Sequence, residues 1–417
     1  MHWPKFSSET IRQKVFDALN KNLNYSTESI LGLPGTFLDQ EQFHSAPFLK
    51  DAPFLSVLVN NPNHIGCHTY SSGEKYFSGT QQLEIDVIRI CAEEIFGAKK
   101  SEYDGYVATG GTEANIQAQW IYRNYFIKNE KAKASEIAVI FSEDAHYSVF
   151  KGANLLGINP ITVKVNFEDR KVLLEDLENK LKEAFDKGIR YLIVHLSMGT
   201  TMFGSVDDSK SFLDVVRKYF KNYFVHVDAA FGGFIYPFSS NEKDLTFENP
   251  EISSVTIDAH KMLQSPYGTG IFLCRKNLIE YAQTEEASYV YGSDFTLCGS
   301  RSGANAISVW MILMTYGSEG WKNVINKFVN ITNHLCDELD QMGIKYHRNP
   351  YMNIVTMVSG QFSESLAKKY HLVADNYQNP QWWKIVTMAH VTQDMIDDFL
   401  IELKTERESK VLDTEMS

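Results

Sequence analysis

The chain has 417 residues, of which 44% are hydrophobic and 22% are charged, and its formal net charge is −12 at pH 7. This length allows one large α/β domain with a smaller one, or two domains of medium size, and the composition is that of an ordinary soluble globular protein. The negative charge and the absence of a long Lys/Arg cluster argue against a general nucleic-acid-binding protein.

The first residues predict an N-terminal arm over 1–60 rather than a domain. A helical start over Ile11–Leu23 leads into a segment that contains glycine and proline. The polar, turn-rich stretch that follows carries His64 and His68, as a loop that lines a binding site would. A helix is then predicted from Thr80 to Phe96, where apolar residues recur near helical spacing.

From residue 103 the chain alternates strands and helices. Several strands are continuous apolar runs without polar alternation, which is typical of a mostly parallel sheet covered on both faces. With helices such as Leu174–Asp186 and Asp208–Phe220 between them, they predict a doubly wound α/β domain whose ligands bind at the carboxyl ends of the strands. The predicted strands are Gly105–Thr109, Ile137–Phe141, Ile161–Val165, Tyr191–Leu196, Tyr223–Val227, Ser253–Ile257 and Gly270–Cys274.

The last quarter of the chain predicts a second, small α+β domain. We place the large domain at 61–303, linking helices with the small domain at 304–405, and a disordered polar tail at 406–417. The predicted elements of this part are the helices Ala304–Tyr316 and Glu319–Met342, the strands Met352–Val358 and Lys384–His390, and a closing helix Thr392–Leu403.

The five cysteines indicate the cellular compartment. They stand at positions 67, 91, 274, 298 and 336. Their odd number and the absence of CxxC spacing favour reduced thiols in a cytoplasm over a disulfide framework or a zinc site, so no metal is predicted. The N-terminus has no apolar signal segment and the longest apolar runs are of strand length, so neither secretion nor a membrane span is predicted.

A glycine pair joins the first predicted strand of the large domain to a helix. Gly110 and Gly111, followed by Thr112, let the backbone approach a ligand closely, and the N–H groups at a helix start bind phosphate. By itself the pattern is more often only a tight turn between a strand and a helix.

Two further polar residues stand at the ends of predicted strands. His146 follows Ile137–Phe141 and is either a capping or core histidine or an aromatic ring stacked on a planar ligand. Asp228 ends the strand Tyr223–Val227, where an unpaired carboxylate is costly and needs a cation. A protonated pyridine nitrogen would serve, and the small Ala230 would leave room for a flat ring. A helix N-cap or a structural ion pair is the simpler alternative for a lone aspartate.

The pair His260-Lys261 follows the strand Ser253–Ile257. A lysine at the end of a buried strand is costly to desolvate unless its amine is used, for instance by condensing with an aldehyde, although a lone lysine here is more often solvated. Jointly, the four sites offer a phosphate cradle, a stacking ring, a carboxylate for a ring nitrogen and a lysine for an aldehyde. Those are the needs of pyridoxal 5′-phosphate (PLP).

The motifs resemble those of fold-type I PLP-dependent enzymes and, within that class, of the group II amino-acid decarboxylases. The chain is most similar to bacterial PLP-dependent histidine decarboxylases and plant serine decarboxylases, with archaeal tyrosine/aspartate decarboxylases and sphingosine-phosphate lyases more distant. The matching motifs are Gly110-Gly111-Thr112-Glu113-Ala114-Asn115, Ala145-His146-Tyr147-Ser148, Gly199-Thr200-Thr201, His226-Val227-Asp228-Ala229-Ala230, His260-Lys261 and Gly299-Ser300-Arg301.

The resemblance implies catalytic roles for four residues. Lys261 would bind the cofactor covalently through its amine. Asp228 would pair with the ring nitrogen, and His146 would stack on the ring. Tyr289 would lie on a mobile loop that completes the neighbouring active site, with Tyr291 as the alternative.

The resemblance also implies how cofactor and substrate are held. Ser300, with its neighbours, would reach the phosphate in the partner subunit, which implies a homodimer with shared active sites. Thr200 would lie near the ring hydroxyl, and residues near His64 and His68 would help to form the side-chain pocket. The remaining predicted cofactor contacts are Gly111, Thr112, Ala230 and His260.

The implied activity is decarboxylation of an L-amino acid to an amine and CO₂. Histidine is the first expectation, with serine, aspartate and aromatic amino acids behind it. Two departures concern the substrate: Ala114 stands where the histidine enzymes usually carry Gly, and Asp258-Ala259 stands where they tend to carry Ser-Gly. The alternatives are a carbon–carbon lyase similar to sphingosine-phosphate lyase and a PLP-binding protein without catalysis.

Overall fold

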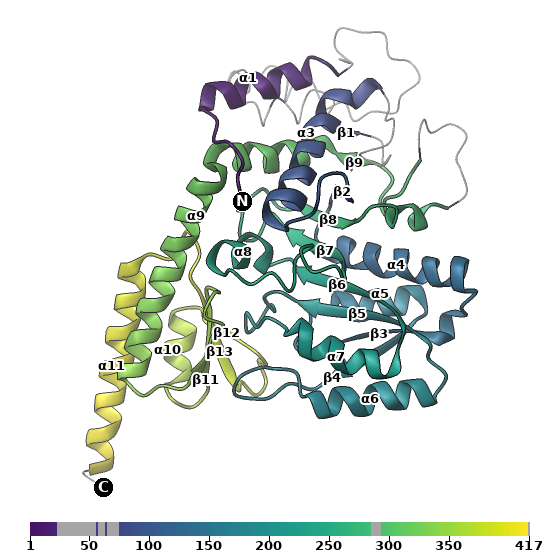
Figure 1. The fold of residues 1–417 in the computed structure, drawn as a ribbon. Helices are drawn as coiled ribbons and strands as arrows, with labels where there is room; N and C mark the ends of the chain where they lie inside the picture. Colours follow the sequence, from purple (N-terminus) through teal and green to yellow (C-terminus); the bar gives the residue numbers. More distant parts are fainter. Residues whose placement is uncertain (23–55, 57–62, 65–74, 285–292, 416–417) are drawn as a thin grey trace.

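The computed structural model describes residues 1–415 apart from 23–55, 57–62, 65–74 and 285–292, and its centre is a seven-stranded sheet (Figure 1). The strands are β2 (Tyr103–Ala108), β3 (Ile137–Ser142), β4 (Asn159–Val163), β5 (Tyr191–Ser197), β6 (Asn222–Ala229), β7 (Ile252–Asp258) and β8 (Gly270–Arg275). They lie in the order β2-β8-β7-β6-β5-β3-β4. Only β8 is antiparallel to its neighbours, β2 and β7, and all other pairs are parallel, which confirms the mostly parallel sheet.

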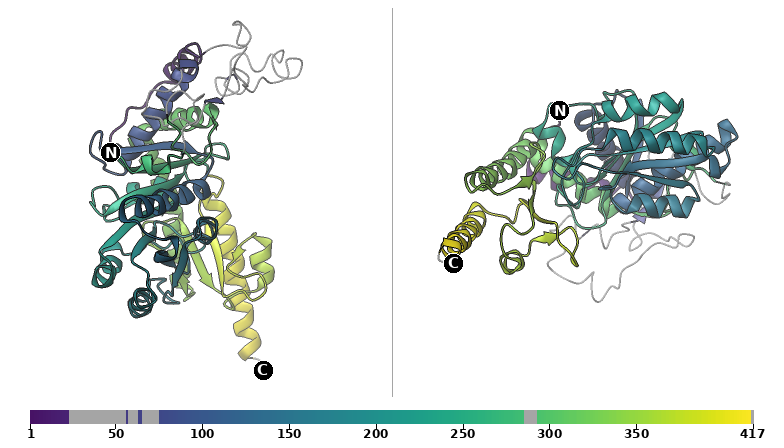
Figure 2. Two further views of the ribbon diagram at one scale, coloured as in Figure 1. Left: turned by 90° about the vertical axis from the view of Figure 1, so that its right-hand side faces the viewer. Right: turned by 90° about the horizontal axis from the view of Figure 1, so that it is seen from below.

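Helices cover both faces of the large sheet, because side chains alternate along each buried strand. The covering helices are α4 (Gly111–Glu130), α5 (Ser148–Leu156), α6 (Leu174–Asp186) and α7 (Ser209–Tyr219). On β3, Val139 belongs to the apolar cluster that contains α4 and α5. Its neighbour Ile140 belongs to the cluster on the other face, which contains α6 and α7 (Figure 2). The doubly wound α/β arrangement is therefore confirmed.

A second, smaller sheet lies near the C-terminus. Its antiparallel strands have the order β10-β11-β13-β12. Its strands and helices are β10 (Tyr346–His347), β11 (Ile354–Val358), β12 (Val373–Ala374), β13 (Trp382–Val386), α10 (Glu364–Lys369) and α11 (Gln393–Glu415). Leu335 and Leu339 from the preceding helix, Val355 and Met357 from β11 and Phe399 from α11 share one apolar core. This is the small α+β unit that the sequence predicts, whereas the exact domain boundaries stay a prediction.

The polar residues after 405 do not form the disordered tail that the sequence predicts. Helix α11 continues to Glu415 and extends beyond the rest of the small unit (Figures 1 and 2). The stretch is rich in Glu, Lys and Arg, which are strong helix formers. Glu406 also accepts hydrogen bonds from the backbone N–H and the hydroxyl of Ser363, at 2.8 and 2.7 Å. The prediction of disorder is therefore wrong as far as Glu415.

The long helix α9 (Gly303–Gln341) joins the two units. The sequence predicts two helices with a break near residue 317, and the backbone does leave helical geometry at Gly317, where φ is 62°. A Cβ atom there would lie 2.9 Å from the backbone nitrogen of Lys5, so the close approach of the N-terminal segment also requires glycine. Trp3 fixes that segment by donating from its indole N–H to the carbonyl of Leu313 at 2.7 Å.

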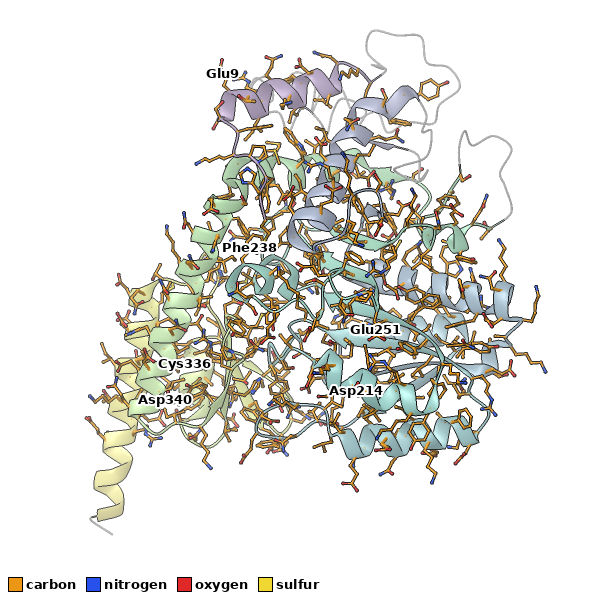
Figure 3. All side chains as sticks on the ribbon, in the orientation of Figure 1. Glu9, Asp214, Phe238, Glu251, Cys336 and Asp340 are labelled. Carbon is orange, nitrogen blue, oxygen red and sulfur yellow. The ribbon has the colours of Figure 1, made fainter. Side chains whose placement is uncertain are left out.

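Helices from the N-terminal part and from the large domain pack around the first half of α9. They are α1 (Ser8–Leu19), α3 (Ser78–Arg89) with a π-helical continuation Ile90–Ile95, and α8 (Tyr236–Ser239). The ring of Phe238 on α8 contacts Trp3 edge to face, with 6.0 Å between the ring centroids (Figure 3). Two short strands, β1 (Asn63–His64) and β9 (Arg301–Ser302), pair beside them. The remaining short helical turns are Lys75–Phe77, Ala134–Glu136, Gly232–Phe234 and Ile279–Ala282.

Two bulk predictions concern the location of the protein. Over the described parts of the chain, we find no helix that is both long and apolar enough to cross a membrane. The described cysteines, at 91, 274, 298 and 336, are free thiols. The cytoplasmic location stays a prediction.

Candidate active site

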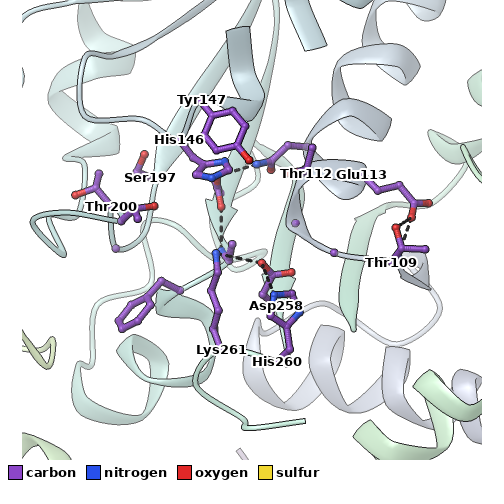
Figure 4. Close-up of a pocket in the computed structure, with 18 of the residues that line it drawn as sticks. Thr109, Thr112, Glu113, His146, Tyr147, Ser197, Thr200, Asp258, His260 and Lys261 are labelled. Carbon is purple, nitrogen blue, oxygen red and sulfur yellow. Dashed lines mark hydrogen bonds and ion pairs between the residues drawn. The ribbon is translucent and has the colours of Figure 1, made fainter. Parts of the chain in front are cut away.

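A cavity of about 220 Å³ opens at the carboxyl ends of β5, β6 and β7. Figure 4 shows Lys261 extending into it between His146 and Asp258, with Thr200 and Ser197 on the side opposite Thr109 and Glu113. The structure brings together here the predicted cofactor residues Gly111, Thr112, His146, Thr200, Asp228, Ala230, His260 and Lys261.

One wall of the cavity is the tight turn between β2 and α4. The carboxylate of Glu113 holds this turn by accepting hydrogen bonds from the backbone N–H and the hydroxyl of Thr109, both at 2.7 Å. A Cβ atom on Gly111 would lie 2.8 Å from Asp258 Oδ2 and 3.2 Å from Ala230 Cβ, so the turn has room only for glycine. The first N–H groups of α4 therefore face the cavity without a side chain in the way, as a phosphate cradle requires.

Asp228 lies at the floor of the cavity and is buried. Its Oδ2 accepts a hydrogen bond from Asn115 Nδ2 at 2.7 Å, and its Oδ1 accepts one from the N–H of Ala230 at 3.0 Å. Burial favours the neutral acid, but the nearby imidazole of His195, the charge of Lys261 and the N–H of Ala230 outweigh it and lower the pKa of Asp228. The site therefore holds a buried, ionised carboxylate that can pair with a cationic ring nitrogen.

A chain of buried hydrogen bonds fixes Asn115 in turn. Asn115 Oδ1 lies 2.9 Å from His226 Nε2, and His226 Nδ1 lies 2.6 Å from Ser254 Oγ. Because the amide nitrogen of Asn115 donates to Asp228, its oxygen must accept, so His226 carries its proton on Nε2 and accepts from Ser254. Burial lowers the pKa of His226 well below its usual value, which agrees with a neutral ring. Tyr122 completes the chain by donating its hydroxyl proton to Ser254.

His146 stands at the mouth of the cavity and is oriented by Ser148. The hydroxyl of Ser148 lies 2.9 Å from His146 Nδ1 and 3.0 Å from Asn115 Nδ2, which donates to it. This arrangement leaves Nδ1 as an acceptor and places the ring proton on Nε2. Burial lowers the pKa of His146, aided by Lys261 and opposed by Asp228 and Asp258. A neutral imidazole that can stack, and can hold a proton at Nε2, therefore lies at this wall.

Lys261 forms an ion pair with a neighbour on its own turn. Its Nζ lies 3.1 Å from Asp258 Oδ2, and His260 Nε2 lies 3.7 Å from the same oxygen. Burial raises the pKa of Asp258, although Lys261 and His260 act against it. About one third of the Lys261 side chain remains exposed (32%), so the amine can be reached from the cavity.

The loop after β5 carries Thr200 and is closed by a hydrogen-bonded turn. Thr200 Oγ1 lies 2.7 Å from Ser205 Oγ, and the N–H of Thr200 donates to the carbonyl of Ser205 at 3.0 Å. Asp207 fixes the returning strand, because its Oδ2 accepts from the N–H of Ser197 at 2.7 Å while its own N–H donates to the carbonyl of Ser197 at 2.9 Å. The loop thus has a defined position beside the cavity.

Among the other predicted site residues, the structure describes the side chain of Ser300 alone, and it lies outside this cavity. Ser300 is exposed and does not line it, and Arg301, its neighbour, is buried in an ion pair with Glu84. His64 lies on β1, whose backbone pairs with Arg301, and its side chain is not described. His68, Tyr289 and Tyr291 lie outside the described residues.

Several residues that shape the site have no role assigned to them by the sequence motifs. Asn115 stands in a quoted motif one helical turn after Gly111, but no role follows from that motif alone. For His195, the sequence of its own strand gives no indication of a role in the site. It becomes visible only through the register of β5 and β6, which pairs His195 with His226 and Ser197 with Asp228 on the same face of the sheet.

The donors and acceptors of the cavity fit PLP. The glycine turn at the start of α4 would hold the phosphate, buried Asp228 would face the ring nitrogen, and the accessible amine of Lys261 would bind the aldehyde. Together with the doubly wound sheet, these features define a PLP-dependent enzyme of fold-type I.

The chain belongs to the pyridoxal-dependent decarboxylase family, because the model of the pyridoxal-dependent decarboxylase conserved domain matches residues 79–347. It is 47% identical over 405 residues to a tryptophan decarboxylase of Clostridium sporogenes, and the alignment covers 96% of this chain and 97% of the relative. It is 31% identical over 410 residues to an L-aspartate decarboxylase of Thermococcus kodakarensis, which covers 95% and 97%. The enzyme is therefore a PLP-dependent carboxy-lyase.

Solved structures of the same fold agree with this architecture. L-Methionine decarboxylase from Streptomyces sp. 590 aligns with a TM-score of 0.68 at 18% identity and covers 95% of this chain and 93% of that chain. Sphingosine-1-phosphate lyase of Burkholderia pseudomallei aligns with a TM-score of 0.69 at 16% identity and covers 98% and 91%. At these identities the likeness shows the fold alone.

The comparisons confirm the enzyme class that the sequence suggests but not the substrate expected first. The group II decarboxylase class is confirmed, whereas histidine as the first substrate finds no support, since the 47% identical relative is named for tryptophan. The reason is physical: the motifs that carried the resemblance contact the cofactor, which is common to the class, and not the substrate side chain. The carbon–carbon lyase and the PLP-binding protein without catalysis are not supported either.

Asp207 makes a pH dependence of stability testable. Burial raises the pKa of Asp207 to about 7, against an ordinary value of 3.8. A raised carboxyl pKa adds stability that is fully present below about pH 4 and is lost as pH rises through 7. We expect the free energy of unfolding to be larger for Asp207→Asn than for the wild type. The difference should grow between pH 4 and 7 toward an upper limit of about 4 kcal/mol and stay constant above that range.

Denaturant titrations of the apoenzyme at several pH values test this expectation. Asp337→Asn is the matched control, because Asp337 is an exposed aspartate on α9. The stabilisation by Asp207→Asn should exceed that of this control at pH 7 and should be smaller at pH 4. A constant difference for Asp207→Asn would contradict the assignment.

Proposed function

We propose that this enzyme decarboxylates L-tryptophan to tryptamine and CO₂. The observation that carries the proposal is the 47% identity to a tryptophan decarboxylase over nearly the full length of both chains. Aromatic side chains at the cavity support it: Tyr147 and Tyr267 line the mouth and are largely exposed, and Phe231 is partly buried beside them. Exposed rings of this kind can stack on an indole.

The charges of the cavity argue against an acidic substrate. Among the described residues that line it, Lys261 is the only lysine or arginine, and it is paired with Asp258. Glu113, Asp228 and Asp258 are carboxylic acids in the same lining. The side chain of aspartate would therefore meet further carboxylates without a spare cation, whereas an indole would meet none of these conflicts.

Lys261, Asp228 and His146 would carry the chemistry. Bound PLP supplies an electron sink, into which the electron pair left by the departing carboxylate can move. Lys261 would hold the cofactor through Nζ and release it to the substrate amine. Asp228 would hold the proton on the ring nitrogen, because its own lowered pKa keeps it ionised. Gly111, Thr112 and His260 would bind the phosphate end, Ala230 would leave space for the ring, and Thr200 would lie near its hydroxyl.

His146 would return a proton to the substrate carbon. Its Nδ1 is engaged by Ser148, so the available proton is the one on Nε2. Its lowered pKa makes the imidazolium a stronger acid, so a ring that has taken up a proton from solvent would readily give one from Nε2. Tyr289, the other proton donor suggested by the sequence, lies outside the described residues.

We also propose a homodimer with shared active sites. Ser300 is exposed outside the cavity of its own chain, as a residue that serves the neighbouring site would be. Arg301 would support the segment from inside, because its ion pair with Glu84 is buried and links β9 to α3. A homodimer has a mass of about twice the 47.6 kDa of one chain, which light scattering measures directly.

A screen of all twenty L-amino acids tests the substrate. The purified enzyme, loaded with PLP, should release CO₂ and amine in equal amounts from L-tryptophan. We expect kcat/KM for tryptophan to exceed that for histidine and aspartate by at least about 100-fold, since an indole pocket leaves charged side chains without partners. D-Tryptophan is the stereochemical control and should give no amine.

Two results would count against the proposal. Preferred turnover of histidine, serine or aspartate would replace tryptophan while leaving the decarboxylase class intact. Formation of an aldehyde from tryptophan without release of CO₂ would contradict decarboxylation as the reaction.

A further inference from the structure

His195 is a buried histidine that lies next to Asp228 without lining the cavity. It points from β5 toward the face covered by α4 and is 1% exposed. Neither of its ring nitrogens has a hydrogen-bond partner in the described part of the chain. The Asp228 carboxylate lies close by, with its Oδ2 3.7 Å from His195 Nε2.

Among the described residues, the neighbouring His226 is already engaged by other groups. The ring of His226 lies 5.2 Å away between centroids, but its Nδ1 is engaged by Ser254 and its Nε2 by Asn115. A buried imidazole that makes no hydrogen bond is costly, and native structures seldom keep one without a reason. Because the carboxylate of Asp228 can accept several hydrogen bonds, it still has capacity for a donor beyond Asn115 and Ala230.

We propose that His195 is a positioning residue that donates a hydrogen bond from Nε2 to Asp228 when PLP is bound. Moving the two atoms together by about half an ångström closes the present gap to hydrogen-bond length. The inference rests on the PLP-dependent decarboxylation proposed above, but not on tryptophan as its substrate.

The bond would set where the proton between Asp228 and the ring nitrogen resides. A hydrogen bond to the ionised carboxylate lowers its affinity for protons. The proton then stays on the ring nitrogen, and the ring keeps the positive charge that attracts electrons from the substrate. Without the donor, the buried carboxylate becomes more basic, so it competes for that proton and holds the cofactor less firmly.

Two variants separate the hydrogen bond from the packing of the side chain. His195→Leu keeps much of the volume and removes the donor, whereas His195→Gln keeps an N–H near the position of Nε2. His390→Leu, a change at an exposed histidine of the small unit, is the matched control. Circular dichroism and thermal unfolding of each apoenzyme identify a variant that fails to fold.

The measurement is the dissociation constant of the cofactor, in the absence of substrate, for PLP and for the analogue that carries carbon in place of the ring nitrogen. We expect His195→Leu to weaken PLP binding by roughly 10- to 100-fold, the range for a hydrogen bond to a charged group, and to change binding of the analogue by less than about threefold. His195→Gln should bind PLP within about threefold of the wild type.

The two cofactors decide the outcome. Equal weakening of both in His195→Leu would show a merely structural role and overturn the proposal, as would unchanged binding of PLP. If His195→Leu fails to fold, His195→Gln decides: preserved PLP binding supports the proposal, and a loss of 10-fold or more overturns it. Because no substrate is present, a wrong substrate assignment leaves these results untouched.

Discussion

A Lys261→Ala variant should lose decarboxylase activity by at least about 10³-fold, because no other lysine lines the described cavity to hold the cofactor and exchange it with the substrate amine. The variant should also lose the visible absorbance of the covalently bound cofactor. Lys276→Ala is the matched control, since Lys276 is exposed just beyond β8, and it should keep full activity.

Lys261→Arg distinguishes the charge of Lys261 from its chemistry. The arginine retains a cation beside Asp258, but a guanidinium stays protonated and does not attack an aldehyde. It should therefore bind PLP without forming the covalent link. Borohydride treatment followed by peptide mass spectrometry should find PLP fixed to Lys261 in the wild type and to no residue in the variant. Substantial turnover by either Lys261 variant would refute the assignment.

Asp228→Asn should lower kcat by roughly 10²- to 10³-fold with a smaller change in KM. The substitution keeps the shape of the side chain and an acceptor for the N–H of Ala230, but it removes the negative charge that faces the ring nitrogen. The electron sink weakens in the reaction step more than in substrate binding, so the loss appears mainly in kcat.

Steady-state kinetics with saturating PLP separate this effect from poor cofactor binding. Asp214→Asn serves as the control, because Asp214 is an exposed member of a surface ion pair with Arg217 (Figure 3). It should leave both constants unchanged. A kcat within about threefold of the wild type in Asp228→Asn would show that this carboxylate does not serve the ring.

The sheet could be predicted from the sequence where strands are buried on both faces, because apolar runs mark them directly. The sequence predicts a strand over Tyr191–Leu196, and β5 is Tyr191–Ser197. The strand β4 begins at Asn159, two residues before its predicted start, and so includes Pro160. Proline is tolerated there since β4 is the edge strand of the sheet, where an absent N–H costs little.

The meeting of most proposed cofactor residues in one cavity could also be predicted, since they follow strands whose carboxyl ends lie at one edge of the sheet. The supporting residues could not. Asn115, His195 and His226 gain meaning only when α4 and two strands are laid over one another, and a sequence contains no cross-strand register. The identity of the substrate was beyond prediction for a related reason, because the motifs describe the cofactor that all such enzymes share.

The pairing of β2 with β8 has a consequence for how the enzyme is made. These strands lie side by side although most of the large domain separates them in the chain. The glycine turn after β2 and the lysine before β8 can meet only after all residues up to Arg275 have left the ribosome. The growing chain therefore cannot bind its cofactor until synthesis is well past the midpoint. Before that moment β2 and β7 lack the strand that lies between them in the complete sheet, so their edges are unpaired on that side.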